Sequence, residues 1–510
     1  MDYVGVSWPR NERADSYPMI TLGKLLRLGN GGRLGHSPNQ PPPLPVQGWE
    51  LDSPLLYFSD HSQDAWRIRD ACEGTQIFGA TGSGKTSGSG RALAQAFLEN
   101  DFGGLVLCAK TDEPELWFRY ARETGRESDI LQLSKEQFNF LDYEANRPGA
   151  GAGQTENLVA LFMQVAEIAN QRHGSAGADL YWERAVKQLL RNAVDLVAIA
   201  RGTVTLPELF EIIRTAPQDM EEARSEAWQA ESACFNYVQQ AGTRAVENPD
   251  VQPEYQMTAK YWLEEFPRMD NRPRSSIVSL FTTLADSFLR GTLRKIFSSG
   301  TTVIPDHTTL GRIILVDLPV KEWSELGQYA GVLMKFMTQK ALERRPVDDT
   351  RPVFIWADEA HYFTTAYDQI FQTTARAARA CTVYLTQNYS NYLSALGGEA
   401  ARPKVDSLLG NLQTKIFHQN GDTVTNNWAA EAIGRRLLYR LSSGNTRSQQ
   451  GSSQTEGEQQ AVDLELQPRE FTTLWKGGPQ YRGLVQGIVF QSGRPWSHGK
   501  TWKRLVFPQA

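Results

Sequence analysis

A run of glycines around one lysine is the clearest chemical signal in the chain. The run directly follows four residues with the composition of a short strand, Thr75 to Phe78. In a P-loop, glycines let backbone N–H groups turn inward around phosphates, the lysine reaches the β and γ oxygens, and the next hydroxyl holds Mg²⁺. A glycine-rich turn with a chance lysine would match only some fixed positions of this motif, and here all of them match. The sequence therefore predicts an ATP and Mg²⁺ site at Gly79, Ala80, Thr81, Gly82, Ser83, Gly84, Lys85 and Thr86.

A P-loop needs an acid on a neighbouring strand for the metal shell, and hydrolysis needs a group that orients water. Two apolar runs end in an acid. Asp317 is followed by Leu-Pro, whereas the run Val353 to Ala357 leads into Asp358 and Glu359. The alternative is that Asp358 only caps the next helix. We expect Asp358 to complete the metal site with Thr86 and Glu359 to polarise the attacking water.

Polar residues around the next apolar run supply two further candidates. The run Thr382 to Leu385 ends in a polar segment that contains Gln387, and a strand-tip glutamine can contact the γ-phosphate. Arg376 precedes the run on an expected helix, where it can reach the site of an adjacent subunit as an arginine finger, with Arg379 as the substitute. Ordinary surface arginines remain the alternative.

The composition is that of a folded globular chain. A length of 510 residues exceeds one ordinary core and predicts two to four domains at roughly 100–200 residues each. The net charge of −5 means that contact with nucleic acid requires a local lining. No signal peptide opens the chain, and no apolar run approaches the roughly 20 residues needed to cross a bilayer. The dispersed cysteines, Cys72, Cys108, Cys234 and Cys381, indicate buried thiols in a reducing compartment, and we expect a cytoplasmic protein.

Changes in the pattern of apolar residues along the chain predict its domains. Buried apolar runs alternate with helical stretches before residue 150 and after residue 300, which favours an α/β core with a mostly parallel sheet. Between them, apolar residues recur at helical spacing, which predicts an inserted all-α domain. The predicted divisions are an extended arm at 1–54, the first part of the α/β domain at 55–150, the all-α domain at 151–300, and the second part at 301–510, with a mobile low-complexity loop at 442–460.

Residues 358–361 spell DEAH and so suggest a superfamily 2 helicase. Such an enzyme carries its acid about a hundred residues after the lysine and follows it with a second RecA-like domain containing an arginine motif. Neither feature is present, so the helicase stays a third hypothesis, which predicts an active monomer.

The order of motifs resembles the TraG/TraD-type coupling ATPases of conjugation and type IV secretion, within the FtsK/HerA group of hexameric DNA motors. The resemblance runs from about residue 55 to the end of the chain. It rests on the P-loop and on Cys108 to Glu113, Tyr181-Trp182-Glu183, Arg274 to Ile277, Trp356 to Ala360, Arg376 before Thr386-Gln387-Asn388, Asn411 to Ile416, and Gly421-Asp422.

This resemblance implies a RecA-like P-loop core, a homohexameric ring, ATP bound between subunits with Arg376 acting in trans, and DNA in a central channel. Partners would include a relaxase, a secretion channel or another protein. Coupling proteins usually begin with a transmembrane anchor, which this sequence does not show, so we expect a soluble variant that contacts a membrane only through a partner.

DNA contact is predicted less directly than ATP binding. Lys110, Arg272, Arg274 and the segment 388–392 are candidates for the channel, because a ring multiplies a few contacts per subunit. Two alternatives to the DNA translocase stay open, namely an ATP-gated docking platform for protein partners and a HerA-like DNA-processing or defence ATPase.

Overall fold

The computed structural model describes residues 48–149, 151–172, 180–298, 300–346, 350–448 and 451–509. Residues 1–47 of the predicted arm lie outside this range. The chain divides into two compact units. The first comprises Met1–Asn100, Cys381–Asn391 and Leu409–Ala510, and the second comprises Asp101–Ala380 and Tyr392–Leu408.

The architecture is mixed α/β around a nine-stranded sheet, as the sequence predicted. Inner strands pair in parallel, for example β3 with β8 and with β9, and β4 with β6 and with β7, whereas β12 pairs antiparallel with β9 and β13. The strand order is β13 (Trp502–Pro508), β12 (Leu484–Gln491), β9 (Thr414–Phe417), β3 (Thr75–Phe78), β8 (Ala380–Thr386), β7 (Val353–Ala357), β4 (Gly103–Leu107), β6 (Ile313–Val316) and β5 (Ile130–Gln132).

The inner strands are apolar because both of their faces are covered. Every residue of β3, β4, β6, β7, β8 and β9 is buried, which is the usual condition of parallel strands. In the second unit, Trp117 of α3 (Glu113–Glu123) stacks on Phe354 of β7 with ring centroids 5.4 Å apart. Only glycine fits at position 104 of β4, because a Cβ there would lie 2.1 Å from a ring carbon of Phe354. The apolar patterning thus sets the sheet and its packing on α3.

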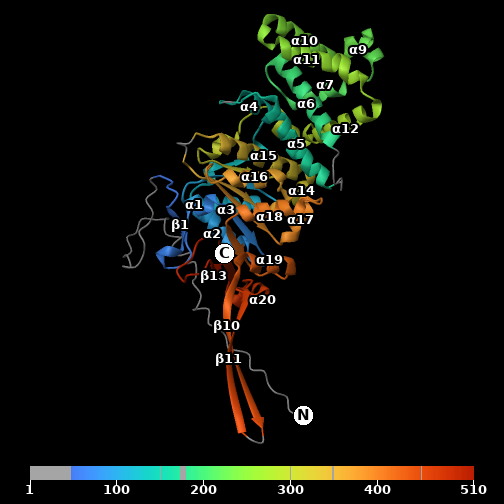
Figure 1. Cartoon of the computed structure of the whole chain (residues 1–510). Helices are drawn as coiled ribbons and strands as arrows, with labels where there is room; N and C mark the ends of the chain where they lie inside the picture. The colour runs from blue at the N-terminus through green and yellow to red at the C-terminus, as the bar shows by residue number, and fades with distance from the viewer. Residues whose placement is uncertain are drawn as a thin grey trace. The chain divides into compact units, whose positions relative to one another are not determined.

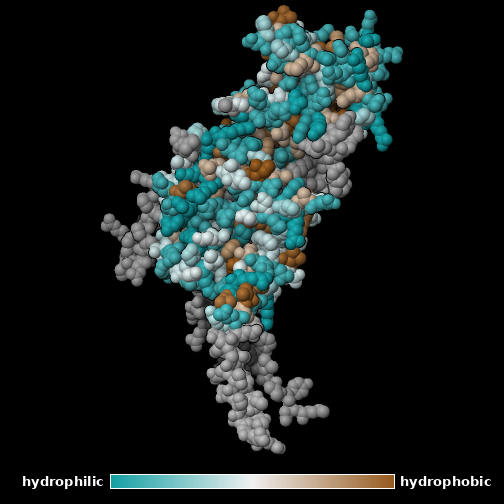
Figure 2. Space-filling view, in the orientation of Figure 1, coloured by the Kyte–Doolittle hydropathy of each residue, from teal (hydrophilic) through white to brown (hydrophobic). Residues whose placement is uncertain are grey.

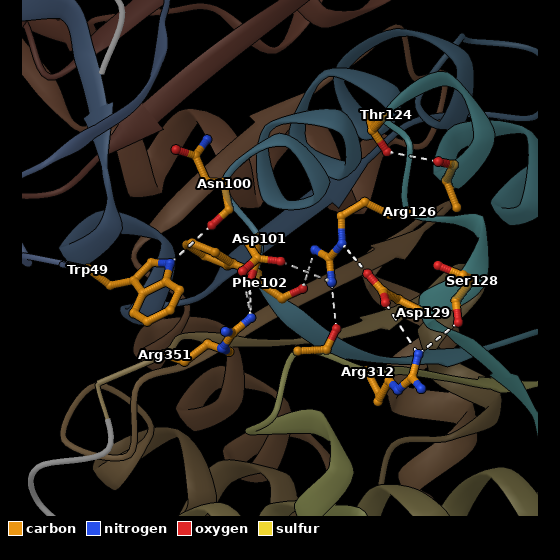
Figure 3. Close-up of polar contacts among 12 residues, drawn as sticks. Trp49, Asn100, Asp101, Phe102, Thr124, Arg126, Ser128, Asp129, Arg312 and Arg351 are labelled. Atoms are coloured by element: carbon orange, nitrogen blue, oxygen red, sulfur yellow. Dashed lines mark hydrogen bonds and ion pairs between the residues drawn. The ribbon is translucent and has the colours of Figure 1, made fainter. Parts of the chain in front are cut away.

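Arginines fix the amino ends of three neighbouring strands in the second unit (Figure 3). The buried guanidinium of Arg126 donates hydrogen bonds to the carbonyl oxygens of Phe102 (2.9 Å) and Gly311 (2.5 Å), just before β4 and β6. Arg351, just before β7, donates to both the carbonyl and the carboxylate of Asp101 at 2.8 Å. These hydrogen bonds hold the amino ends of the strands in place. They therefore also help to position the carboxyl ends, where ligands bind in α/β sheets.

The segment after β5 is helical throughout its described part (Figure 1). Helices α10 and α11 pack on α6, and α12 packs on α6 and α7. Leu289 and Arg290 separate the last two helices of this segment, and Arg290 has extended backbone geometry. The helices are α4 (Phe140–Asn146), α5 (Thr155–Arg172), α6 (Leu180–Arg201), α7 (Leu206–Arg214), α8 (Met220–Arg224), α9 (Glu226–Glu231), α10 (Ala233–Glu247), α11 (Gln252–Lys260), α12 (Asn271–Phe288) and α13 (Gly291–Phe297).

The remaining helices flank the strands of the two units. Those between β6 and β8 lie in the second unit, and α15 contacts β4 and β6 there. The elements are α1 (Ile68–Cys72), α2 (Arg91–Glu99), α14 (Val320–Trp323), α15 (Glu325–Arg344), α16 (Ala366–Thr374), α17 (Tyr389–Leu396), α18 (Ala401–Asn411), α19 (Thr423–Ile433) and α20 (Pro468–Thr472), with the small sheet of β1 (Pro54–Tyr57) and β2 (Ala65–Arg67).

A long hairpin occupies the stretch that composition predicted as a mobile loop at 442–460. Strands β10 (Arg435–Ser448) and β11 (Gly451–Leu464) pair antiparallel as a separate two-stranded sheet. Its base pairs Leu437 with Val462 and Leu438 with Ala461, residue types that favour strands. The structure differs from the prediction because backbone pairing, once begun at such a base, can continue through a polar sequence that carries no apolar alternation.

The described surface is mainly hydrophilic on the face shown in Figure 2, with scattered hydrophobic residues. Val246, Met257 and Leu310 are among the most exposed apolar side chains. All four cysteines are buried thiols outside any disulfide, as predicted. No helix in the described residues is both long and apolar enough to cross a membrane.

Candidate nucleotide site

The glycine-rich stretch forms a tight loop at the carboxyl end of β3 in the first unit. Gly82 and Gly84 have φ values of +72° and +83°, which glycine adopts without steric cost. Two backbone bonds anchor the loop start: Gly79 donates to the carbonyl of Thr386 (3.3 Å) and Ala80 donates to that of Gln419 (2.9 Å). The neighbouring parallel strands β8 and β9 therefore set where the loop leaves the sheet.

Close packing inside the loop explains the glycine positions. A Cβ at Gly79 would lie 2.3 Å from the hydroxyl oxygen of Ser83, and one at Gly84 would lie 2.5 Å from Val485 of β12. The Ser83 hydroxyl is fully buried and has no hydrogen-bond partner. A buried polar atom without a partner is costly unless a ligand or water satisfies it. This cradle fits a phosphate group, because phosphate oxygens accept from hydroxyl and backbone N–H groups.

Lys85 and Thr86 lie where the loop turns into the helical segment that continues as α2. The Lys85 side chain is only 6% exposed. The first turn, Thr86–Gly90, has π-helical hydrogen bonding, in which the amide of Gly90 donates to the carbonyl of Lys85 at 2.8 Å. The helix N-terminus thus follows the loop directly, and the N–H groups and dipole of a helix N-terminus favour an anion.

His418, at the end of β9, is a site residue that the sequence analysis missed. Its ring bridges the Ser89 hydroxyl (2.6 Å) and the carbonyl oxygen of Gln486 (2.8 Å). The pKa of His418 is lowered to about 4, mainly by burial; the hydrogen bond to Gln486 opposes this shift, and the charge of Lys85 contributes to it. A neutral imidazole therefore ties the P-loop helix to β12. Only its place at a strand end beside the loop could have suggested this role.

Gln387 follows β8 beside the P-loop strand and is half-buried. Its carbonyl oxygen accepts a hydrogen bond from the Asn420 side chain at 2.8 Å. Asn420 also accepts from the Asn426 side chain through its own carbonyl. The strand tip that carries Gln387 is thereby fixed within the first unit.

The predicted acid pair lies in the second unit, directly after β7. Asp358 and Glu359 are 2% and 5% exposed. Glu359 has left-handed backbone geometry with φ +48°, which is uncommon for a residue with a side chain and clusters at functional sites. Its amide donates to Asp358 Oδ1 at 2.9 Å. Carboxylate oxygens are the ligands that Mg²⁺ prefers, so this pair fits the role of a metal-shell acid beside a water-orienting group.

Lys110 lies against the acid pair. Its Nζ is 2.5 Å from Asp358 Oδ2 and 3.7 Å from both Glu359 Oε1 and Glu113 Oε1. Burial alone would lower the pKa of Lys110, but the neighbouring carboxylates outweigh it and raise the pKa. Burial raises the pKa of Glu113, and the charge of Asp358 adds to this effect. The second unit thus holds a cluster of buried carboxyl groups with one lysine.

The competing acid, Asp317, has a structural role. It follows β6 and accepts hydrogen bonds from the backbone amide (2.9 Å) and the hydroxyl (2.5 Å) of Ser134. The side chain of Gln132 approaches the same carboxylate at 3.4 Å. Asp317 is therefore engaged with the segment after β5, which distinguishes it from Asp358.

Arg376 and Arg379 lie in the turn after α16, whereas the sequence predicted a helix there. The helix ends at Thr374, and Arg379 has φ +50° before the chain enters β8. Arg376 is exposed and Arg379 is half-buried. Exposure suits a residue that acts on another molecule.

Three of the DNA-contact candidates are packing residues within their units. Arg274 is buried and donates to the carbonyl of Met269 at 3.2 Å. Tyr389 and Tyr392 are 3% and 0% exposed. Arg272 and part of Lys110 remain exposed.

Comparison with known proteins agrees with the motif order. Residues 352–475 match the family model described as the TraM recognition site of TraD and TraG. The bacterial conjugative coupling protein TrwB, in an unbound crystal form, matches with a TM-score of 0.56 and 14% identity over 90% of this chain and 89% of that chain. The predicted resemblance to TraG/TraD-type coupling proteins is confirmed.

The TraG/TraD-type resemblance extends to TrwB structures with nucleotides. TrwB in complex with ADP and Mg²⁺ matches with a TM-score of 0.55 and 13% identity, and TrwB with the ATP analogue ADPNP matches with 0.55 and 14%. Each alignment covers 97% of this chain and 93% of the TrwB chain. The fold is thus the RecA-like P-loop NTPase core with a helical insertion. No curated protein sequence matches the chain.

Proposed function

We propose that this chain is an ATP-hydrolysing coupling ATPase that moves DNA through a ring of identical subunits. The observation that carries the proposal is the loop at the end of β3, where a buried lysine and a buried hydroxyl without a partner line a glycine cradle. The fold is shared with TrwB, whose solved complexes hold ADP with Mg²⁺ and an ATP analogue.

In this proposal the residues divide the work of hydrolysis. Backbone amides of 79–86 and the side chain of Lys85 hold the phosphates, and Thr86 and Asp358 hold Mg²⁺. Bound Mg²⁺ neutralises charge that develops on the phosphate oxygens. Glu359 orients the attacking water and Gln387 senses the γ-phosphate.

Arg376 acts in trans, on the nucleotide of an adjacent subunit. Its exposed position suits this task, because an exposed side chain can reach another molecule. A homohexameric, cytoplasmic ring with DNA in its channel follows from the family resemblance. A relaxase or secretion-channel component would meet the ring, so that any membrane contact is made through that partner.

A protein-docking platform is the second candidate function. The match of residues 352–475 to a TraM recognition site favours this function, because the region that contains the acid pair resembles a protein-recognition site. A platform hydrolyses ATP in response to a protein partner and is indifferent to DNA. A HerA-like DNA-processing or defence ATPase shares the motor but serves other partners.

The test is ATP hydrolysis by the full chain with and without single- and double-stranded DNA. We expect DNA to raise kcat several-fold, and Lys85→Ala to lower the DNA-stimulated kcat by about 100-fold or more. Lys260→Ala removes an exposed lysine of α11 and serves as the matched control, with wild-type activity.

If hydrolysis is unaffected by DNA but rises with a partner protein, the chain is a protein-docking platform and not a DNA motor. Full activity of Lys85→Ala would contradict the nucleotide site itself.

A further inference from the structure

The strand order in the first unit gives the two sides of the P-loop different roles. Strand β8, which leads to Gln387, lies on one side of β3, and β9, β12 and β13 follow one another on the other side. In the proposed function Gln387 senses the γ-phosphate, so the γ end of a bound nucleotide faces β8. The base, at the opposite end of the same molecule, then leaves the cradle on the side of β12 and β13.

The segment 475–483 lies on that side and is tied to the P-loop helix through Gln509. The Gln509 carboxamide donates from Nε2 to Ser87 Oγ at 3.0 Å, and its Oε1 accepts from the amide of Gly478 at 2.8 Å. The backbone amide of Gln509 donates to the carbonyl of Gly483 at 2.7 Å. Gln509 therefore joins the residue that directly follows the P-loop motif to two points of the segment.

Close contacts and backbone geometry show that this junction is tightly built. A Cβ at Gly477 would lie 1.9 Å from Gln509 Oε1, so glycine is needed where the two segments touch. Arg482 has a φ of +53°, which is uncommon for a residue with a side chain and clusters at functional sites. The segment then enters β12, whose Val485 lies against Gly84 of the loop.

Two stacked aromatic rings belong to this segment. The rings of Trp475 and Tyr481 have centroids 5.5 Å apart and planes 11° from parallel. Both side chains are half-buried, so part of the pair is accessible to a ligand. The carbonyl of Trp475 accepts from the amide of Gln486 in β12 at 3.0 Å, which fixes the start of the segment. Aromatic side chains bind bases by stacking, and a purine offers the larger ring system.

We propose that the segment 475–483 forms the nucleobase end of the nucleotide site, with the Trp475–Tyr481 pair as a stacking platform for a purine. This inference rests on the proposed function, because it extends the phosphate cradle to the rest of the nucleotide. Gln509 is a positioning residue, since it holds the segment on Ser87. The platform favours purine nucleotides over pyrimidine nucleotides that carry the same phosphates.

The test is isothermal titration calorimetry of the full chain with three probes, namely ADP, CDP and inorganic tripolyphosphate, each with Mg²⁺. ADP and CDP differ only in the base, and tripolyphosphate reports on the cradle alone. Trp475→Ala removes one ring of the platform, and Trp475→Phe keeps an aromatic ring. Trp502→Ala is the matched control, because Trp502 is half-buried in the same unit but lies at the opposite end of β13 from Gln509.

We expect the wild type to bind ADP about tenfold more tightly than CDP, a ratio within the range of base–aromatic stacking. Trp475→Ala should lose most of this preference and keep its affinity for tripolyphosphate, which also shows that the cradle is folded. Trp475→Phe and Trp502→Ala should keep the preference. Gln509→Ala should lower the preference without changing tripolyphosphate binding, because the segment then loses its tie to Ser87.

Equal binding of ADP and CDP by the wild type, or an unchanged preference in Trp475→Ala, would overturn the inference and leave the phosphate cradle in place. The inference is also wrong if Trp475→Ala weakens tripolyphosphate binding as much as ADP binding, because the ring then supports the cradle instead of a base. If the wild type binds neither ADP nor tripolyphosphate, the nucleotide site and with it the proposed function fail as well.

Discussion

At the scale of single residues, His418 links the nucleotide site to pH. Its imidazole is neutral in the folded chain because burial holds the pKa at about 4, below the ordinary value of 6.5. The unfolded chain binds a proton between these values and the folded chain does not, so stability is complete above pH 6.5 and is lost as pH falls towards 4. A difference of this size corresponds to about 3 kcal/mol in the free energy of unfolding.

Chemical denaturation of the wild type and of His418→Asn between pH 7.5 and 4 checks this prediction. We expect the variant to lose about 3 kcal/mol less over that interval, because asparagine does not titrate there. His61→Asn, at an exposed position, is the control and should follow the wild type. Parallel pH profiles for the wild type and His418→Asn would contradict the assignment.

Residue spacing predicted the P-loop stretch and the acid pair as candidates, and the structure places each at the end of a buried strand. Spacing could not predict the partners of these residues. The contact between Lys110 and Asp358, and the bridge from His418 to Ser89, join positions hundreds of residues apart. Such contacts depend on strand order, which local sequence does not encode.

At the scale of elements, a buried ion pair fixes the segment that follows the acid pair. Lys335 of α15 and Asp368 of α16 are 1% and 0% exposed and are in direct contact. Lys335 also donates to the carbonyl of Phe363 at 2.6 Å, and Asp368 accepts from the amide of Thr365 at 2.7 Å. The pair therefore anchors both the turn after Glu359 and the start of α16.

We expect Lys335→Ala to lower the free energy of unfolding by about 3–5 kcal/mol, because Asp368 would stay buried without its cation. Lys340→Ala is the matched control on the same helix. Its partner, Glu343, is partly exposed, and the loss should be below about 1 kcal/mol. Urea denaturation measures both losses in the free energy of unfolding. Equal losses would show that the buried Lys335 pair stabilises the fold no more than the partly exposed Lys340 pair.

Elements were predictable where apolar composition was strong. The bounds of β3 and β7 agree with the predicted runs, and β8 begins two residues before and ends one residue after its predicted run. Strand β5 has three half-buried residues, and its sequence did not predict a strand. The low-complexity sequence of β10 and β11 did not predict the hairpin that these strands form. In both cases strand pairing, rather than composition, determines the structure.

At the scale of the whole molecule, the proposed function depends on two stretches that lie far apart in the sequence. The P-loop lies in the first unit and the acid pair in the second. The helical region between them in sequence explains why the acid comes so long after the lysine. Motor function requires that both stretches act on the same Mg²⁺ and ATP.

The most direct test is a crystal structure of the full chain with Mn²⁺ and a non-hydrolysable ATP analogue, in which anomalous scattering locates the metal. We predict a Mn²⁺ ion about 2.1 Å from the Thr86 hydroxyl, with Asp358 bound to it directly or through one water, and with Lys85 on the β and γ phosphates. A metal bound away from Asp358, or a nucleotide bound outside the loop at 79–86, would contradict the account.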